Sequence, residues 1–281
     1  ALANCTLAPK STWQPAVMSS GVAFSASLWL IPFSHGMNII EVGAGKGKMS
    51  ILMNLLGANT TLIEKDEEVM QHAKLAHKAF GCKSNYILAD AMALPAEMFN
   101  KFNISMSFGT VEHFVGKERQ EIIDIHFSLL KNKGLSLIHV PNKWGIFYRI
   151  AFAIWKLLGS WPKDLPEIPF THSELKKKGA YAGYKDMTVV GCSTITSDFR
   201  SFILHNLKSR LLKIFYGKSP EKTFHAKTIS TNNQDKLLNI IKGEAPKSPL
   251  KPRSAQQYSG ERISFVSNYF GYILLLIAYK K

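Results

Sequence analysis

The chain has 281 residues, of which 46% are hydrophobic, a composition that supports one large folded domain and excludes global disorder. The three cysteines are far apart, and His72 and His77 lie five residues apart rather than the four that place two ligands on one helix face. We therefore expect no disulfide framework and no metal site, which fits a reducing, cytoplasmic compartment. The net charge of +15 indicates either a solvated basic surface or an anionic partner, which would be a nucleic acid or a membrane surface.

The first 37 residues are predicted to form an N-terminal cap segment. Their uncharged stretch contains Pro15, Pro32 and many serines, which makes it a poor membrane span, and it does not resemble a signal peptide. Its aromatic side chains either cover a pocket mouth from one side of a helix or belong to the core, and the core is the commoner role of such stripes. They are Trp13, Phe24, Trp29 and Phe33.

From Asn38 onward, short apolar strands alternate with helices whose apolar residues recur at helical spacing. The strands are expected at Asn38–Val42, Thr60–Glu64, Asn85–Leu88, Ile104–Phe108 and Leu135–Val140. The helices are expected at Lys46–Leu56, Asp66–Phe80 and Lys117–Leu130. This alternation predicts an α/β fold with a doubly wound, mostly parallel sheet that helices cover on both faces.

A nearly apolar helix, Trp144–Trp161, is expected after the fifth strand, with Arg149 and Lys156 on one narrow polar stripe. Thr171–Glu174 has the sequence of a capping box and begins a short helix, which we expect to end at Gly179. Two more strands are expected, at Met187–Gly191 and Tyr272–Tyr279. The sheet therefore has seven predicted strands.

A basic insertion separates the last two strands. Arg200–Arg262 contains 13 Lys or Arg residues and 4 Asp or Glu residues, a net charge of +9. Phe202–Tyr216 has the pattern of an amphipathic helix, and Ala245–Ser259 is rich in Pro, Ser and Lys, as loops are. We divide the chain into the cap segment 1–37, a core 38–199, a basic lid 200–262 and a closing strand 263–281.

Four glycine-rich or polar motifs follow successive strands. Glu41–Gly47 places three glycines between the first strand and its helix, where backbone N–H groups can approach a ligand. Glu64 ends the second strand and is suited to accept both hydroxyl hydrogens of a ribose. Asp90–Ala91 follows the third strand and suits the amine and edge of a base, and Ser107–Phe114 follows the fourth. Because parallel strands end at the same edge of a sheet, the motifs together predict a site for a nucleotide-type cofactor.

Through these motifs, residues 38–142 resemble the class I S-adenosylmethionine-dependent methyltransferases, in particular the group that includes the quinone-biosynthesis enzymes. The matching stretches are Ile-Ile-Glu-Val-Gly-Ala-Gly-Lys-Gly at 39–47, Leu-Ala-Asp-Ala-Met-Ala-Leu-Pro at 88–95, Gly-Thr-Val-Glu-His-Phe at 109–114 and Leu-Lys-Asn-Lys-Gly at 130–134. The resemblance implies a Rossmann-like sheet whose last strand is antiparallel, and S-adenosylmethionine as the cofactor.

The resemblance also implies roles for individual residues. The three glycines would form the loop on the methionine side, Glu64 would hold the ribose, and Asp90 with the backbone of Ala91 would bind adenine. Ser107 and Gly109 would line the wall beside the transferable methyl group. The expected cofactor-binding residues are Glu41, Gly43, Ala44, Gly45, Gly47, Glu64, Lys65, Asp90, Ala91, Ser107 and Gly109.

Methyl transfer from a sulfonium needs an aligned acceptor and a dry site, and needs a base only where the acceptor loses a proton. His113 is the best-placed candidate for that base and Glu112 a weaker one, whereas the alternative for His113 is a histidine at a helix start that hydrogen-bonds the backbone. The family often has Thr or Ser soon after the third glycine, where this chain has Lys48 and Met49 before Ser50. The stretch Ser-Phe-Gly-Thr lacks the Asn/Asp-Pro-Pro-aromatic signature of enzymes that methylate nucleic-acid bases, so a nucleic acid is the less expected substrate.

Two other functions remain open. An NAD-dependent oxidoreductase would have its third glycine three positions after the second, where this chain has Lys48, so we expect no nicotinamide binding. An inactive homologue would keep the cofactor site and act as a partner subunit.

The expected acceptor is small and lipophilic or itself a lipid. Aromatic and basic residues in Trp144–Trp161 and Phe202–Tyr216 suit helices that lie among lipid headgroups, so we expect peripheral contact with an anionic membrane. The alternative is that both helices pack as a lid or against a second subunit.

Overall fold

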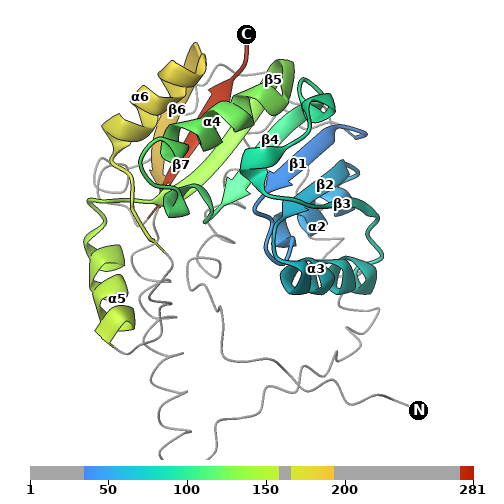
Figure 1. Cartoon of the computed structure of the whole chain (residues 1–281), viewed down its shortest axis with the longest axis horizontal. Helices are drawn as coiled ribbons and strands as arrows, with labels where there is room; N and C mark the ends of the chain where they lie inside the picture. Colours follow the sequence, from blue (N-terminus) through green and yellow to red (C-terminus); the bar gives the residue numbers. More distant parts are fainter. Residues whose placement is uncertain (1–34, 158–165, 193–272) are drawn as a thin grey trace, which may run out of the picture.

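The computed structural model describes residues 35–157, 166–192 and 273–281, and its seven strands form one sheet in the order β3-β2-β1-β4-β5-β7-β6 (Figure 1). The sheet runs in parallel except at β7, which pairs antiparallel with both β5 and β6. The strands are β1 (Asn38–Val42), β2 (Asn59–Glu64), β3 (Ser84–Leu88), β4 (Phe102–Phe108), β5 (Leu130–Pro141), β6 (Asp186–Cys192) and β7 (Ile273–Tyr279). The expected α/β fold with an antiparallel last strand is confirmed.

Helices cover both faces of this sheet, with α4 and α6 on one face and α2 on the other (Figure 1). The described helices are α2 (Lys48–Leu55), α3 (Glu67–Ala79), α4 (Glu118–Leu129), α5 (Ile146–Leu157) and α6 (His172–Ala182). Short 3₁₀ turns follow β3 and β4, and they are η1 (Ala91–Ala93), η2 (Ala96–Met98) and η3 (Val111–His113).

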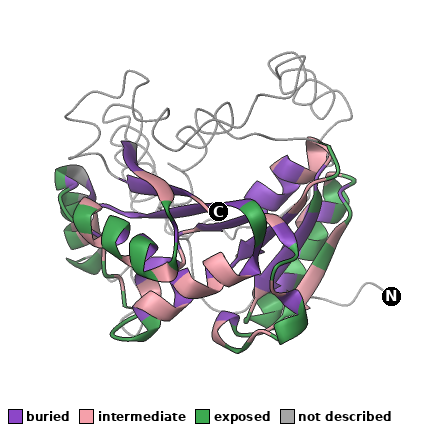
Figure 2. Cartoon of the chain, turned by 90° about the horizontal axis from the view of Figure 1, so that it is seen from above, coloured by how far each residue is buried: buried purple, intermediate pink, exposed green. Residues whose placement is uncertain are grey.

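The core consists of two layers because alternate residues of each strand point to opposite faces. Ile40 of β1 packs in the layer that contains Ile122 of α4, whereas its neighbour Ile39 packs in the layer that contains Met53 of α2. Figure 2 shows the result, with buried residues concentrated on the sheet and exposed residues on the outer sides of the helices. Burial on both faces explains why these strands are nearly continuous apolar runs in the sequence.

The prediction that the helix after Thr171 ends at Gly179 is wrong, since α6 continues to Ala182. A Cβ atom on Gly179 would lie 3.0 Å from the Sδ atom of Met187, so this glycine lets the helix approach the sheet closely. The cap is instead Gly183, whose φ of 105° belongs to the left-handed region that favours glycine.

Only half of the predicted capping box forms. The Thr171 hydroxyl accepts a hydrogen bond from the Glu174 backbone N–H at 3.1 Å, as expected. The Glu174 carboxylate does not return to the cap, because it accepts a 2.7 Å hydrogen bond from the Nε atom of Arg119. Glu174 therefore joins α6 to α4.

Several sequence predictions concern residues outside the described ranges. The aromatic residues of the cap segment, the candidate helix Phe202–Tyr216 and the loop Ala245–Ser259 are among them, and so is the end of the apolar helix beyond Leu157. Within the described ranges, we find no helix that combines the length and the hydrophobicity needed to cross a membrane.

Candidate functional site

The carboxyl ends of β1 to β4 meet at one edge of the sheet, and backbone hydrogen bonds fix the turns that leave them. The N–H of Ala44, just after β1, donates to the carbonyl of Ile63 in β2 at 2.9 Å. The N–H of Ala89, just after β3, donates to the carbonyl of Glu64 at 3.0 Å. The predicted cofactor-binding motifs are therefore held side by side.

The glycine turn after β1 has one open position. Gly43, Gly45 and Gly47 have φ values of 63°, 54° and 63°, which strain other residues. A Cβ atom on Gly43 would collide with the Thr110 side chain, and one on Gly47 would lie 2.5 Å from the Cδ2 atom of Leu62. A Cβ atom on Gly45 would meet nothing within 4 Å, so a ligand can approach the backbone there.

The Glu64 carboxylate lies over this turn. Its Oε2 atom accepts a 2.9 Å hydrogen bond from the Gly45 N–H, and its Oε1 atom accepts one of 2.8 Å from the Lys65 N–H. Lys65 thus contacts Glu64 through its backbone N–H. The geometry joins three of the predicted residues and places an acidic acceptor directly beside the open position of the turn.

Asp90 and Ala91 begin η1 directly beyond the end of β3. The Oδ1 atom of Asp90 accepts a 2.9 Å hydrogen bond from the Met92 N–H and so caps this short turn, while Ala91 is buried behind it. The carboxylate is thereby oriented at the same edge of the sheet as Glu64, which suits the predicted contact with an adenine amine.

Glu41 faces away from the open turn and into the first turn of α2. It is buried, and its Oε2 atom accepts hydrogen bonds from the backbone N–H of Ser50 at 3.0 Å and from the Ser50 hydroxyl at 2.5 Å. Burial raises the pKa of Glu41 to about 7. The family often has Thr or Ser soon after the third glycine, and in this chain Ser50 follows that glycine by three positions. Ser50 is nevertheless the hydroxyl residue that binds Glu41.

Ser107 and Gly109 lie at the carboxyl end of β4. Ser107 is fully buried, and within the described residues its Oγ atom has no hydrogen-bond partner. Gly109 has a φ of 74° and donates its N–H to the His139 carbonyl at 3.3 Å. These two residues, which are predicted to form the wall beside the methyl group, lie shortly before η3 in the chain.

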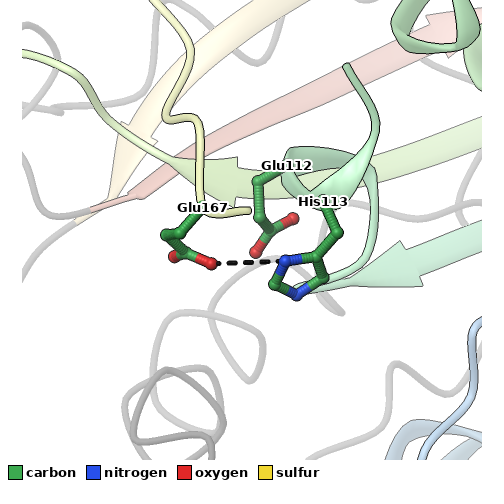
Figure 3. Close-up of side chains that lie close together, drawn as sticks. All are labelled: Glu112, His113 and Glu167. Carbon is green, nitrogen blue, oxygen red and sulfur yellow. Dashed lines mark ion pairs between the residues drawn. The ribbon is translucent and has the colours of Figure 1, made fainter. Parts of the chain in front are cut away.

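Directly beyond this wall, His113 meets two glutamates (Figure 3). Its Nδ1 atom donates to the Pro166 carbonyl at 2.7 Å and lies 3.5 Å from the Oε2 atom of Glu167. The other oxygen of Glu167 accepts a 2.8 Å hydrogen bond from the Tyr148 hydroxyl. Glu167 is not among the residues predicted from the sequence. It lies in the irregular segment before α6, 54 residues after His113, and has no periodicity or motif to mark it.

Burial dominates the electrostatics of this group. Burial, followed by the nearby Glu167 charge, raises the pKa of Glu112 well above its usual value, and Arg119 opposes this. Burial also raises the pKa of Glu167 to about 7 and lowers the pKa of His113, against hydrogen bonds from His113 to the backbone of Pro166 and Gly109. The His113 ring is thus bonded to the backbone, as the alternative to a base expects.

The chain is similar to known proteins in one domain and in its fold. The family described as a methyltransferase domain matches residues 39–134, whereas no curated protein matches the chain. The fold is similar to that of a SAM-dependent methyltransferase from Archaeoglobus fulgidus, with a TM-score of 0.55, 14% identity, and coverage of 93% of this chain and 94% of that one.

Two further solved structures share the fold. One is Haemonchus contortus phosphoethanolamine N-methyltransferase 2 in complex with S-adenosyl-L-methionine, with a TM-score of 0.54, 16% identity, and coverage of 92% of this chain and 52% of that one. The other is the cyclase SpnF, with a TM-score of 0.57, 15% identity, and coverage of 96% of this chain and 83% of that one.

Identities this low establish the fold alone, and the cyclase shows that the fold also serves another reaction. The domain match adds an indication of function, which the fold alone does not give. Residues 39–134 match the methyltransferase domain family, in agreement with the methyl-transfer function that the resemblance implied.

Proposed function

We propose that this chain transfers the methyl group of S-adenosylmethionine to a small, lipophilic acceptor. The observation that carries the proposal is the Glu64 carboxylate, which is held over a glycine turn whose central position, Gly45, is open. An acid at this place accepts the hydroxyl hydrogens of a ribose, and the exposed backbone of the turn admits the methionine part. Asp90, at the next strand end, takes the amine of adenine.

The cofactor's sulfonium supplies the electrophilic methyl group, and the chain's residues align it. Gly43, Gly45 and Gly47 shape the loop, and Ser107 with Gly109 forms the wall beside the methyl group. The remaining predicted contacts, Ala44, Lys65 and Ala91, act through their backbones, and Glu41 acts indirectly by holding the first turn of α2. His113 remains the candidate base for an acceptor that must lose a proton.

Calorimetric titration of S-adenosylmethionine tests this assignment. Glu64→Ala and Asp90→Ala should each weaken binding by about tenfold or more, because each removes a charge-assisted hydrogen bond to the ligand. Glu68→Ala is the matched control, since it removes an exposed carboxylate only four residues after Glu64 and should bind as the wild type does. NAD should not bind; unchanged affinity in both strand-end variants, or a preference for NAD, would refute the assignment.

A lipophilic acceptor is supported by the surface near α5. Tyr148 is buried against Ile273, but large apolar side chains of the same region remain exposed. Trp144, Ile146, Ile150 and Leu157 are between 46% and 86% exposed. This apolar surface follows the carboxyl end of β5 and suits peripheral contact with a lipid membrane. A quinone-type acceptor would be found in such a membrane. This would place a cytoplasmic enzyme at the membrane; the same surface would also fit a second subunit.

Co-sedimentation with anionic vesicles tests the membrane proposal. The wild type should bind, less so as salt rises, and Ile150→Glu with Leu157→Glu should lower the bound fraction severalfold because charged side chains resist insertion. Leu75→Glu on α3 is the matched control, since Leu75 is 65% exposed and belongs to a different helix. A wild type that ignores anionic vesicles at low salt would favour a soluble acceptor beneath a lid. The basic residues Lys208, Arg210 and Lys213, which would add to such binding, lie outside the described residues.

A further inference from the structure

The two glutamates and the histidine beyond Gly109 converge on one point. Glu112 and His113 come from η3, and Glu167 comes from the segment before α6. Each offers one ligand atom, and these atoms all lie within 4.8 Å of one another. Figure 3 shows the Glu112 carboxylate between the His113 ring and Glu167. Two segments more than fifty residues apart thus bring three potential ligands together.

Two carboxylate oxygens of this group are buried without a hydrogen bond. Within the described residues, the Oε2 atoms of Glu112 and Glu167 have no hydrogen-bond partner, and Glu112 is only 1% exposed. Arg119 does not compensate them by hydrogen bonding, because its nitrogens donate to Glu174, Ile168 and Pro169. A buried carboxylate without such compensation is costly, so the two oxygens require a cation or protons.

The spacing around the His113 Nδ1 atom suits a metal ion. The Pro166 carbonyl oxygen lies 2.7 Å from Nδ1, and the Oε2 atom of Glu167 lies 3.5 Å from it. Ligand atoms bound about 2.1 Å from one ion at right angles are about 3 Å apart, so these separations fit neighbouring ligands. The Pro166 carbonyl is therefore placed to act as a fourth ligand when its hydrogen bond to Nδ1 is replaced by an ion.

We propose that Glu112, His113, Glu167 and the Pro166 carbonyl bind a divalent transition-metal cation. Three oxygens and one imidazole form a mixed set that suits Mn²⁺, Fe²⁺ or Zn²⁺. On binding, the imidazole carries its proton on Nε2 and presents Nδ1 to the ion, and a backbone hydrogen bond to Gly109 holds the ring, as partners of metal-bound histidines do. Tyr148 orients Glu167 in the same way, by bonding its other oxygen.

This proposal departs from the expectation that the chain has no metal site. That expectation considered ligands close together in the sequence, whereas these come from residues 112–113 and 166–167. The site is formed by the isolated backbone contacts that bring the two segments together, among them the 3.0 Å hydrogen bond from the Ile168 N–H to the Glu112 carbonyl. Metal binding does not depend on the binding of S-adenosylmethionine or on methyl transfer, so either proposal can fail alone. A metal-bound His113 has no free ring nitrogen, so the metal site replaces its role as the candidate base.

Electron paramagnetic resonance with Mn²⁺ as the probe tests the site on the full chain. The wild type should bind one Mn²⁺ per chain, and Zn²⁺ should displace it. Glu112→Gln and Glu167→Gln should weaken binding by about a hundredfold, and Tyr148→Phe by about tenfold, because it loses only the contact that orients Glu167. Glu118→Gln, an exposed carboxylate six residues after Glu112, should bind like the wild type.

Thermal unfolding of the same variants separates ligand loss from misfolding. With about 1 mM Mn²⁺ the wild type and Glu118→Gln should melt at higher temperature than without it, because the ion binds only the folded chain. Glu112→Gln should gain nothing from Mn²⁺, although it should melt no earlier than the wild type in the absence of metal, since it removes a buried charge. A wild type that binds no Mn²⁺ at this concentration, or glutamine variants and Tyr148→Phe that bind it as tightly as the wild type, would overturn the proposal.

Discussion

Glu41 illustrates how the protonation of a single buried acid can change the free energy of unfolding. Its carboxyl lies under α2 with Ser50 as its hydrogen-bond partner, and burial raises its pKa from 4.5 to about 7, with the nearby Glu64 charge adding to the effect. Between pH 4.5 and about pH 7, the Glu41 carboxyl is protonated in the folded chain but ionised in the unfolded chain. The free energy of unfolding therefore falls as pH rises through this window.

Replacing this acid by its neutral isostere should remove that pH dependence. Near pH 5, Glu41→Gln and the wild type should be similarly stable, because the wild-type carboxyl is then protonated in the fold. Near pH 8 the variant should be more stable by up to about 3 kcal/mol, since it avoids burying a charge. Urea unfolding at both pH values measures this, with Glu68→Gln as the exposed control. An equal difference from the wild type at both pH values would contradict the assigned pKa.

The ease of predicting a site residue depended on whether the sheet itself positions it. Glu64 and Asp90 follow apolar strands directly, so the strand pattern alone placed them at one edge. Glu41 was recognised for its position beside the glycines, but its direction depends on packing under α2, which a sequence pattern does not encode. Glu167 could not be found, because an irregular segment brings it to Glu112 through isolated contacts.

The sequence predicted which helices and strands form more accurately than it predicted the residues at which they begin and end. The strand β2 begins one residue before its predicted start, and β5 begins five residues earlier because Leu130 pairs with Phe102 ahead of a register shift. Local pairing of this kind leaves no periodic signal. Similarly, Gly179 and Gly183 are equally plausible helix ends in the sequence, and only the contact with Met187 shows that the first serves packing.

The strand order of the whole sheet depends on where β7 pairs. β7 is inserted between β5 and β6, so a segment that is last in sequence has neighbours on both sides. No spacing in the sequence predicts that order, and the antiparallel direction was expected only from the resemblance. Lys280, just after β7, continues the connection: its ammonium group donates to Asn100, Phe127 and Leu130, and it lies 4.6 Å from the centre of the Phe127 ring.

Lys280 should therefore contribute to the stability of the whole sheet. Lys280→Met keeps much of the aliphatic stem but loses three charge-assisted hydrogen bonds. These link the residue after β7 to α4, to Asn100 before β4 and to Leu130 at the start of β5. Because this site is partly exposed to solvent, we expect a loss of about 1–2 kcal/mol in the free energy of unfolding. Urea unfolding should show a lower midpoint with an unchanged slope, since the folded chain still buries the same sheet. The adjacent Lys281→Met is the matched control, because Lys281 is exposed and should leave the midpoint unchanged. Identical midpoints for the two variants would show that β7 is held by its strand pairing alone.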